Sequence, residues 1–494
     1  MTRVRSRAGL RVGRVVAALL VLALPGCRGG EPSAGPSEDQ SHSSLPVPSL
    51  PPVSPATPPP LTNTGPLGLK WSWFQPETFG YVVDARGTAT FAEVEWCEVE
   101  PSPGVRRWDE VDQVVGKARD LGYRVMIKLR AGQCWATEPP DPTLLRDTNE
   151  AAVKQPSSMP TDLTAYQSFV SELVTRYAGQ GVHDWAIENE VDVANFWVSD
   201  LTEYEQLVRQ VAPVIRAADP EAHLVGPGLS SSSYGVVMAA AVLASGDGEA
   251  AVSTYQRFYE RRQEGGVSRW PEISDSSTLG ALLADTAAQR SMQAAEVEIR
   301  LTTEGVFDAY QLHYYESVEV LPGLLEWLRG RLGQAPIEAW EYGAAWPGEG
   351  YSATAHSEEL LRGTAILLAA GVDRVVYLPL AWTPSSKQQV FRGLIQPDGT
   401  LLPPGQTWLL LSQLVPDLGP PRGITGALTG VSWPRGSGSA AIVWSSDGTE
   451  VPLGLPDDAE VRDATGQVVD GRAVIAPVLV LSSSPGLGDR LSTR

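Results

Sequence analysis

The stretch Asp184-Trp-Ala-Ile-Glu-Asn-Glu-Val-Asp192 decides which fold the sequence predicts. Its apolar run, Trp185–Ile187, is typical of a buried strand, and Glu188, Asn189 and Glu190 follow directly. Buried parallel strands are apolar, so carboxylates at the exit of such a strand are expected to face a site. A barrel enzyme places an acid and its orienting amide there. Taken alone, the same residues fit the start of a surface loop, so the prediction depends on the rest of the chain.

Strand and helix patterns alternate over residues 63–418. Short apolar runs predict strands at 67–73, 91–96, 123–129, 185–187, 223–227, 307–313, 336–340 and 372–380. Apolar residues at helical spacing predict helices at 109–121, 166–177, 204–215, 358–370 and 406–414. Strands that alternate with helices in this way predict an α/β fold of the (β/α)8 TIM-barrel type. No glycine fingerprint of the dinucleotide or P-loop type follows a predicted strand, which argues against a doubly wound sheet.

The N-terminal segment, residues 1–27, predicts a lipoprotein signal peptide, because several arginines precede the apolar run Val15–Leu24. That run has signal-peptide length and is too short to span a bilayer. It ends in Leu24-Pro25-Gly26-Cys27, which resembles a bacterial lipobox, in which the cysteine is lipidated; an ordinary secretory signal is the alternative. Residues 28–62 are rich in Pro and Ser and predict a disordered linker. We therefore expect an extracytoplasmic protein, lipid-anchored to a bacterial membrane through Cys27.

Two further segments depart from the barrel pattern. Residues 230–305 have a mostly helical composition and are longer than one crossover helix needs, which predicts an insertion. Residues 419–481 hold short alternating runs separated by turn signals such as Asp447-Gly448, and predict a small C-terminal β-sandwich. Residues 482–494 are expected to form a frayed tail.

The composition limits the possible functions. The net charge of −20 argues against a nucleic-acid partner, because phosphate binding needs a basic face. It favours a neutral substrate. The 15 tryptophans suit the apolar faces of sugars, although most are expected in the core. The five histidines show no HxxH or HExxH spacing, so neither a metal nor another cofactor is expected. We expect a monomer whose partner is a carbohydrate.

A second carboxylate, Glu341, follows the predicted strand at 336–340. This is the seventh strand and Glu190 ends the fourth, so both side chains are expected at the same mouth of the barrel. Glycosidic cleavage needs such a pair, with one carboxyl protonated to donate to the leaving oxygen and the other ionised to attack the anomeric carbon. Mutual repulsion raises the pKa of one carboxyl of a close pair. Glu190 and Glu341 are therefore the candidate catalytic residues, and Glu188 is the less favoured acid.

These motifs resemble those of the retaining glycoside hydrolases of clan A, nearest in look to family 39 β-xylosidase-like or family 5 enzymes. Trp185–Glu190 is similar to the strand-four acid/base motif, and Glu341-Tyr-Gly343 is similar to the strand-seven nucleophile motif. His313-Tyr-Tyr315 resembles the strand-six His-x-Tyr, whose tyrosine holds the nucleophile. The resemblance spans about Leu67 to Leu414.

The resemblance also implies substrate-binding residues, namely Asn189, His313, Tyr315, Trp382 and Trp96. Asn189 would bond the 2-hydroxyl of the sugar, Tyr315 would orient the nucleophile, and Trp382 would stack on the sugar. Trp96 opens a segment similar to a second-strand W…EP…G signature. Tyr315 and Trp382 fit packing positions at a barrel rim almost equally well.

Two features leave alternatives open. The family usually has an arginine in strand two that keeps the nucleophile ionised, but none occurs within Thr88–Glu95, so Arg130 or Arg86 could substitute. Cys97 and Cys134 follow adjacent predicted strands. In an exported protein they could form a disulfide across the barrel mouth, or they could be two free buried thiols.

The expected function is that of a retaining β-glycoside hydrolase, which cleaves O-glycosidic bonds of a poly- or oligosaccharide outside the cytoplasm by two-glutamate double displacement. Two alternatives remain at this point. One is a carbohydrate-binding surface lipoprotein that does not hydrolyse. The other is a transglycosylase that uses the same two glutamates.

Overall fold

The structure is a computed structural model that describes residues 65–71, 75–138, 156–348, 350–381 and 390–492. All of these residues belong to one compact unit, Val47–Arg494. The expected signal peptide, the linker, Cys27 and Trp382 lie outside the described residues. Among the helices that are described, none has the length and apolar character needed to cross a membrane.

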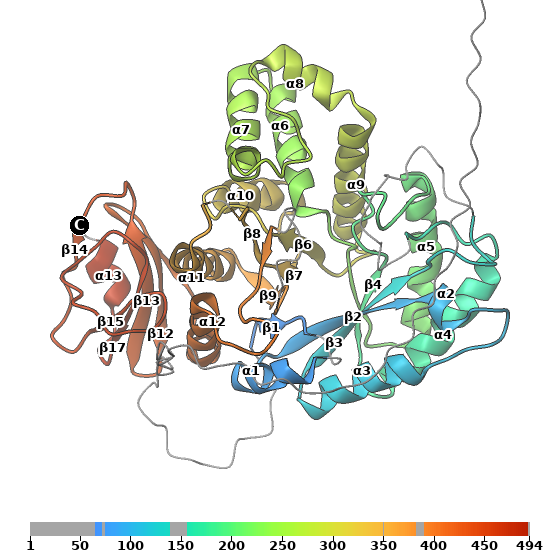
Figure 1. The fold of residues 1–494 in the computed structure, drawn as a ribbon, viewed down its shortest axis with the longest axis horizontal. Coiled ribbons are helices and arrows are strands. Elements are labelled where there is room, and N and C mark those ends of the chain that lie inside the picture. Colours follow the sequence, from blue (N-terminus) through green and yellow to red (C-terminus); the bar gives the residue numbers. More distant parts are fainter. Residues whose placement is uncertain (1–64, 72–74, 139–155, 349, 382–389, 493–494) are drawn as a thin grey trace, which may run out of the picture. The chain divides into compact units, whose positions relative to one another are not determined.

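Eight parallel strands form two four-stranded sheets (Figure 1). The first sheet contains, in order, β2 (Ala89–Glu95), β3 (Arg124–Arg130), β4 (Asp184–Ile187) and β5 (His223–Val225). The second contains β1 (Leu67–Leu69), β9 (Val372–Tyr377), β7 (Ile337–Tyr342) and β6 (Tyr310–Tyr314).

Backbone hydrogen bonds join the two sheets at both edges. The Thr88 N–H donates to the Leu67 carbonyl at 2.9 Å beside β1, and a parallel bridge connects Val225 of β5 with Ala309 before β6. The strands therefore follow one another round a closed ring in chain order, as a (β/α)8 arrangement requires. The prediction of a mixed α/β fold with parallel strands is confirmed.

Helices connect successive strands of the ring, and the last helix follows the final strand, β9. They are α1 (Phe79–Asp84), α2 (Trp96–Val99), α3 (Asp109–Asp120), α4 (Leu163–Ala178), α5 (Leu201–Ala218), α10 (Leu321–Leu332), α11 (Ala353–Ala369) and α12 (Pro403–Leu414). The apolar side chains that predict α4 are all buried. Asp162 caps α4, and Asp200 forms a capping box with Glu203 at the start of α5. Helix α11 begins earlier than predicted, because Ser352 caps it by accepting from the Ala355 N–H.

The interior of the ring is filled by one apolar layer. Its buried members are Ala89, Phe91, Met126, Ala186, Val225, Ala309, Trp340 and Val376. Inward side chains alternate along a strand, so the polar residues nearer the carboxyl ends of the strands lie above this layer. The layer thus forms the floor on which the candidate site is built.

The segment between β5 and β6 consists mainly of helices α6 (Tyr234–Ala244), α7 (Gly248–Glu264), α8 (Ser276–Leu283) and α9 (Thr286–Thr303). Helices α6, α7 and α8 stand together in Figure 1, and α9 leads back towards the ring. Arg290 of α9 donates to the carbonyls of Val191 and Trp197 at 2.8 and 2.7 Å. The segment therefore holds the loop that follows Glu190.

The C-terminal part is a five-stranded antiparallel sheet with a two-stranded ribbon. The sheet order is β11 (Arg422–Ile424), β12 (Leu428–Arg435), β13 (Gly438–Ser445), β17 (Val478–Ser482) and β15 (Glu460–Arg462), and the ribbon pairs β14 (Val451–Pro452) with β16 (Ala473–Val474). Alternate residues of β13 enter different cores: Ala440 and Ile442 pack with the main core, whereas Ala441 and Val443 pack in a separate small cluster. Both faces of the sheet are therefore covered.

The residues expected to form a frayed tail instead contain a helix, α13 (Leu487–Ser492). Leu487 and Leu491, one helical turn apart, are each 1% exposed and join the small C-terminal cluster. Two leucines at this spacing give a short helix an apolar side that can cover the sheet.

Candidate active site

Glu341 lies near the end of β7 and faces the inside of the ring. Its Oε1 accepts from Lys128 Nζ at 2.6 Å, and its Oε2 accepts from the Tyr315 hydroxyl at 2.8 Å. A register shift in the β6–β7 pair places His313 opposite Glu341 rather than opposite Trp340. Without this bulge, the period-two pattern would put Glu341 on the outer face with Ile337. The bulge is therefore what brings this carboxylate into the site.

Gly343 allows the chain to leave β7 in this position. A Cβ atom built at Gly343 would lie only 2.1 Å from the Leu378 carbonyl oxygen and 2.9 Å from the Tyr315 ring. Any larger residue would displace the tyrosine that contacts Glu341. Close packing therefore requires a glycine at the last position of the Glu341-Tyr-Gly343 motif.

Glu190 follows β4 in a loop with unusual backbone angles. The φ values are +68° at Glu188 and +39° at Glu190, a left-handed region that non-glycine residues seldom adopt. The turn directs the two side chains to different places. Glu188 is fully buried and accepts from the Ala131 N–H at 2.7 Å, whereas Glu190 faces His313. Backbone strain of this kind costs about 1–3 kcal/mol per residue and gathers at functional sites.

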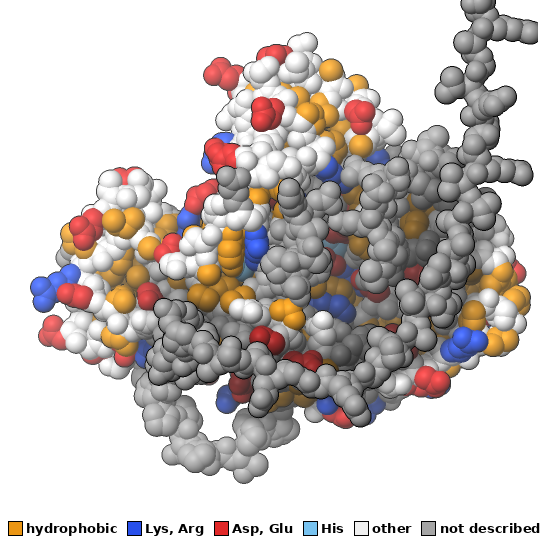
Figure 2. Space-filling model, viewed as in Figure 1, with side chains coloured by type: hydrophobic (Ala, Val, Ile, Leu, Met, Phe, Trp, Pro, Cys, Tyr) orange, Lys and Arg blue, Asp and Glu red, His pale blue; other side chains and the backbone are white. Residues whose placement is uncertain are grey.

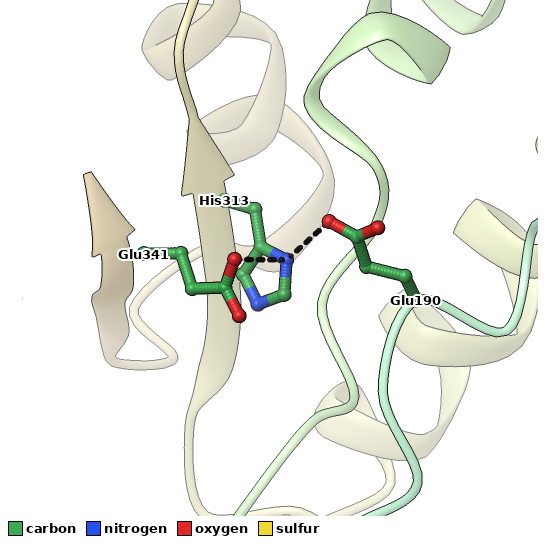
Figure 3. Close-up of side chains that lie close together, drawn as sticks. All are labelled: Glu190, His313 and Glu341. Atoms are coloured by element: carbon green, nitrogen blue, oxygen red, sulfur yellow. Dashed lines mark hydrogen bonds and ion pairs between the residues drawn. The ribbon is translucent and has the colours of Figure 1, made fainter. Parts of the chain in front are cut away.

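His313 lies between the two carboxylates (Figure 3). Its Nδ1 is 3.0 Å from Glu190 Oε1 and 3.7 Å from Glu341 Oε2. One oxygen of each carboxylate and one ring nitrogen of His313 all lie within 4.8 Å of one another. The ring itself is fully buried. The polar atoms of His313 contact protein groups in this structure, and the ring bridges the carboxylate pair; a substrate-binding role for His313 stays a prediction.

The environment moves the pKa values of the two glutamates in opposite directions. Burial raises the pKa of Glu190, and the nearby Glu341 and Asp192 add to this effect. Burial acts on Glu341 in the same sense, but His313, Lys128 and the Tyr315 hydroxyl together outweigh it and lower the pKa of Glu341 to about 2. Glu341 is thus the ionised member of the pair, and Glu190 is the member that retains a proton more readily.

Lys128 supplies the positive charge beside Glu341, in place of the two arginines that the sequence suggested. Its side chain is fully buried, lies 4.3 Å above the Phe91 ring, and also donates to Asn189 Oδ1 at 2.6 Å. Arg86 precedes β2 and so belongs to the opposite end of the ring. Arg130 pairs instead with Glu95, at 3.4 Å. A lysine from strand three therefore substitutes for the expected strand-two arginine.

Lys128 is the principal residue that the sequence interpretation missed. It sits within the apolar run at 123–129, on the same face as Met126 of the interior layer. A lysine at an inward position of a buried strand is a usable signal, because buried cations are almost always paired.

The other predicted residues have different outcomes. Asn189 is 2% exposed, and its Oδ1 is engaged by Lys128. Tyr315 makes the expected contact with Glu341. Trp96 is fully buried, and its indole N–H donates to Glu100. Trp96 packs against a core of aromatic rings, so its ring has no exposed face for a sugar in this structure.

Cys97 and Cys134 form a disulfide, with a Cα–Cα distance of 5.5 Å. This separation is within the range that a disulfide requires. The link connects the segments that follow β2 and β3, beside the carboxyl ends of those strands. The alternative of two free thiols does not describe this structure.

Glu190, His313 and Glu341 are also the group of described side chains that could hold a metal ion, since each offers one ligand atom. The ammonium of Lys128 already lies 2.6 Å from Glu341 and supplies positive charge there. The protein's own cation therefore supplies positive charge to this carboxylate.

Acidic and basic side chains are scattered over the described part of the face in Figure 2.

The overall fold is similar to several solved structures. A family 39 glycoside hydrolase from the gut symbiont Bacteroides cellulosilyticus WH2 has a TM-score of 0.55 at 14% identity, covering 85% of this chain and 81% of that one. A GH39 β-xylosidase from Caulobacter crescentus has a TM-score of 0.52 at 12% identity, covering 85% and 96%. The GH39 enzyme from Xanthomonas axonopodis pv. citri has a TM-score of 0.51 at 12% identity, covering 86% and 95%.

No family model matches the sequence, and no curated protein matches it. At these low identities, the structural likeness shows a shared fold. The chemistry must be argued from the site itself.

Proposed function

We propose that the protein is a retaining β-glycoside hydrolase on a (β/α)8 barrel, with Glu341 as nucleophile and Glu190 as acid/base. The observation that carries this proposal is the pair of carboxylates. One oxygen of Glu190 and one oxygen of Glu341 lie within 4.8 Å of each other. The pKa of Glu190 is raised and that of Glu341 is lowered. Retaining enzymes have carboxyl groups about 5–5.5 Å apart, whereas inverting enzymes need about 6.5–9.5 Å to admit a water molecule.

In the first step, an ionised Glu341 oxygen attacks the anomeric carbon. The bond between that carbon and the leaving oxygen breaks, and its electron pair takes the proton of Glu190. Lys128 and Tyr315 hold the attacking carboxylate with one hydrogen bond on each oxygen. The products of this step are a glycosyl ester on Glu341, the free alcohol and an ionised Glu190.

In the second step, Glu190 removes a proton from a water molecule that attacks the same carbon. The ester bond breaks, the sugar leaves with its original anomeric configuration, and Glu341 returns as a carboxylate. Once Glu341 is esterified, its negative charge no longer repels Glu190, which can therefore act as the base.

The substrate class that fits this site is a neutral oligo- or polysaccharide with a β-linkage. Trp135 is 41% exposed and packs on Trp96 beside the carboxyl end of β3, where its ring could contact a sugar. Because one similar structure is a β-xylosidase, β-xylosides are the first substrates to test.

Replacement of the two glutamates tests the proposal. Aryl β-glycosides are assayed with the wild type, Glu341→Gln and Glu190→Gln, with Glu98→Gln as a control outside the pair. We expect Glu341→Gln to lose nearly all turnover, and NMR of the first product to show the β-anomer. Unchanged turnover in Glu341→Gln, or an α-product, would refute the assignment.

The same assay separates the alternatives. A wild type that binds oligosaccharides without turnover would favour the hypothesis of a carbohydrate-binding lipoprotein that does not hydrolyse its ligand. Transfer of the sugar to an added acceptor, in preference to water, would favour a transglycosylase.

We also propose that the protein is exported and anchored by a lipid on Cys27. The lipobox-like ending of the apolar run supports this location, and so does a disulfide between Cys97 and Cys134, since disulfides persist in oxidising compartments. Metabolic labelling with a fatty acid is expected to mark the wild type and to fail with Cys27→Ser. Equal labelling of both would contradict the proposal.

A further inference from the structure

Gln311 lies two residues before His313 on β6, and its side chain is fully buried beside the histidine. The side-chain amide nitrogen donates to the Gly226 carbonyl. Its carbonyl oxygen, Oε1, is 2.9 Å from His313 Nε2. The amide cannot be reversed, because two carbonyl oxygens would then face each other at Gly226.

This arrangement decides which ring nitrogen carries the proton in neutral His313. An amide oxygen only accepts, so His313 Nε2 must be the donor. Lys128 Nζ also approaches Nε2, at 3.4 Å, but this ammonium makes its two short bonds, each 2.6 Å, to Asn189 and Glu341. Gln311 therefore determines the tautomer, and Nδ1 of the neutral ring is left with a lone pair.

The lone pair on Nδ1 faces Glu190 Oε1 at 3.0 Å (Figure 3). Two acceptors cannot bond to each other, so the contact needs a proton, and with a neutral ring that proton belongs to Glu190. The contact then holds the carboxyl as an acid, with its hydrogen directed at His313 Nδ1. This is the protonation state that the first chemical step needs.

We propose that Gln311 is a positioning residue for catalysis, which fixes His313 as the Nε2–H tautomer so that Nδ1 holds the proton of Glu190. The inference rests on the proposed function, because it gives the role of acid to Glu190. Gln311 touches neither the sugar nor the reacting atoms and acts through His313.

Helix α9, in the segment between β5 and β6, helps to hold Gln311 and His313 in place. Glu298 of α9 accepts from the backbone N–H of Gln311 at 3.0 Å and from that of Gly228 at 3.4 Å. Gly228 has a φ of +71°, and a Cβ there would lie 2.3 Å from His313 Nε2. The glycine thus leaves room for the ring, and the helix fixes the strand segment that carries Gln311.

The test compares an aryl glycoside with an alkyl glycoside of the same sugar. A dinitrophenyl glycoside needs no proton on its leaving group, whereas an alkyl glycoside does. For Gln311→Leu, we expect the ratio of the alkyl rate to the dinitrophenyl rate to fall about 10- to 100-fold, part of the 10²–10⁴-fold that general acid catalysis supplies. Gln256→Leu on α7 is the control, and its ratio should not change.

Gln311→Glu provides a second variant. A carboxylate at this position would attract a second proton to the ring, so that Nδ1–H donates to an ionised Glu190. The ratio should then fall at neutral pH and recover as the pH is lowered. An equal loss on both glycosides, in both variants, would show a merely structural role and overturn the proposal, as would an unchanged ratio.

A measurement independent of turnover completes the test. Two-bond ¹⁵N–¹H NMR of the full chain with labelled histidine should show His313 protonated on Nε2 only, with the signal assigned by its loss in His313→Asn. A proton on Nδ1 alone would overturn the proposal. If the wild type cleaves no glycoside, the proposed function fails, while the spectrum still decides the tautomer.

Discussion

Replacing Lys128 with methionine should disable the nucleophile without greatly changing the volume of the core. The lysine is fully buried, and its ammonium lies 2.6 Å from Glu341 Oε1. Methionine keeps the apolar stem over the Phe91 ring but removes the charge and the hydrogen bond. Breaking one partner of a buried ion pair costs about 3–5 kcal/mol, because the remaining charge is left uncompensated.

The direction of the pH effect follows from the pKa of Glu341. Burial raises this pKa, and Lys128 is one of the groups whose opposing effect lowers it to about 2. Without Lys128, His313 and Tyr315 still oppose the effect of burial but with less total strength, so the pKa of Glu341 should rise from about 2 towards its ordinary value of 4.5. The acidic limb of kcat/KM should therefore move to higher pH, and each pH unit of this shift corresponds to about 1.4 kcal/mol.

The stability of the fold should change with the same sign. A carboxyl with a lowered folded-state pKa stabilises the folded protein above its unfolded pKa, and this contribution is lost as the pH falls through the folded pKa. For Glu341 the window runs from 4.5 down to about 2. The contribution is about 3 kcal/mol by linkage, and Lys128→Met should lose the part of it that Lys128 supplies at neutral pH.

The assay is kcat/KM against pH with an aryl β-glycoside, together with urea unfolding at several pH values. Lys128→Arg retains the charge and should keep the acidic limb close to that of the wild type. Lys117→Met, on the outer helix α3, is the surface control. If Lys128→Met showed the wild-type pH profile and stability, the electrostatic role assigned to Lys128 would be refuted.

Three further predictions concern groups around the site. Tyr315→Phe removes a hydrogen bond to a charged group, worth about 1.5–3 kcal/mol, so kcat should fall about 10- to 100-fold while circular dichroism is unchanged. Burial raises the pKa of Glu188 to about 7, so the wild type should lose stability as the pH rises from 4.5 through 7; in urea titrations, Glu188→Gln should lack this loss. Cys97 and Cys134 are 37 residues apart, so Cys97→Ser should lower the unfolding free energy by about 4 kcal/mol; an equal effect of reductant on variant and wild type would contradict this.

Local patterns in the sequence were sufficient for the elements of the fold. The spacing of Tyr166, Phe169 and Leu173 predicts α4, and the apolar run Trp185–Ile187 predicts β4, because burial of one helix face or one strand is a property of consecutive residues. The order of two glutamates at strand ends likewise followed from the chain. The predicted ends of elements were less accurate, as the earlier start of α11 shows. The helix α13, in the expected tail, was not predicted.

The partners across the ring could be decided only by the tertiary structure. The pairing of Lys128 with Glu341 joins β3 to β7, and the inward turn of Glu341 depends on the bulge between β6 and β7. Neither the closure of the ring nor the register of a parallel pair can be read from residue spacing within one strand. The sequence by itself determined two candidate carboxylates and an α/β scaffold; the packing of distant strands decided that a lysine and a histidine hold them and that Trp96 lies in the core.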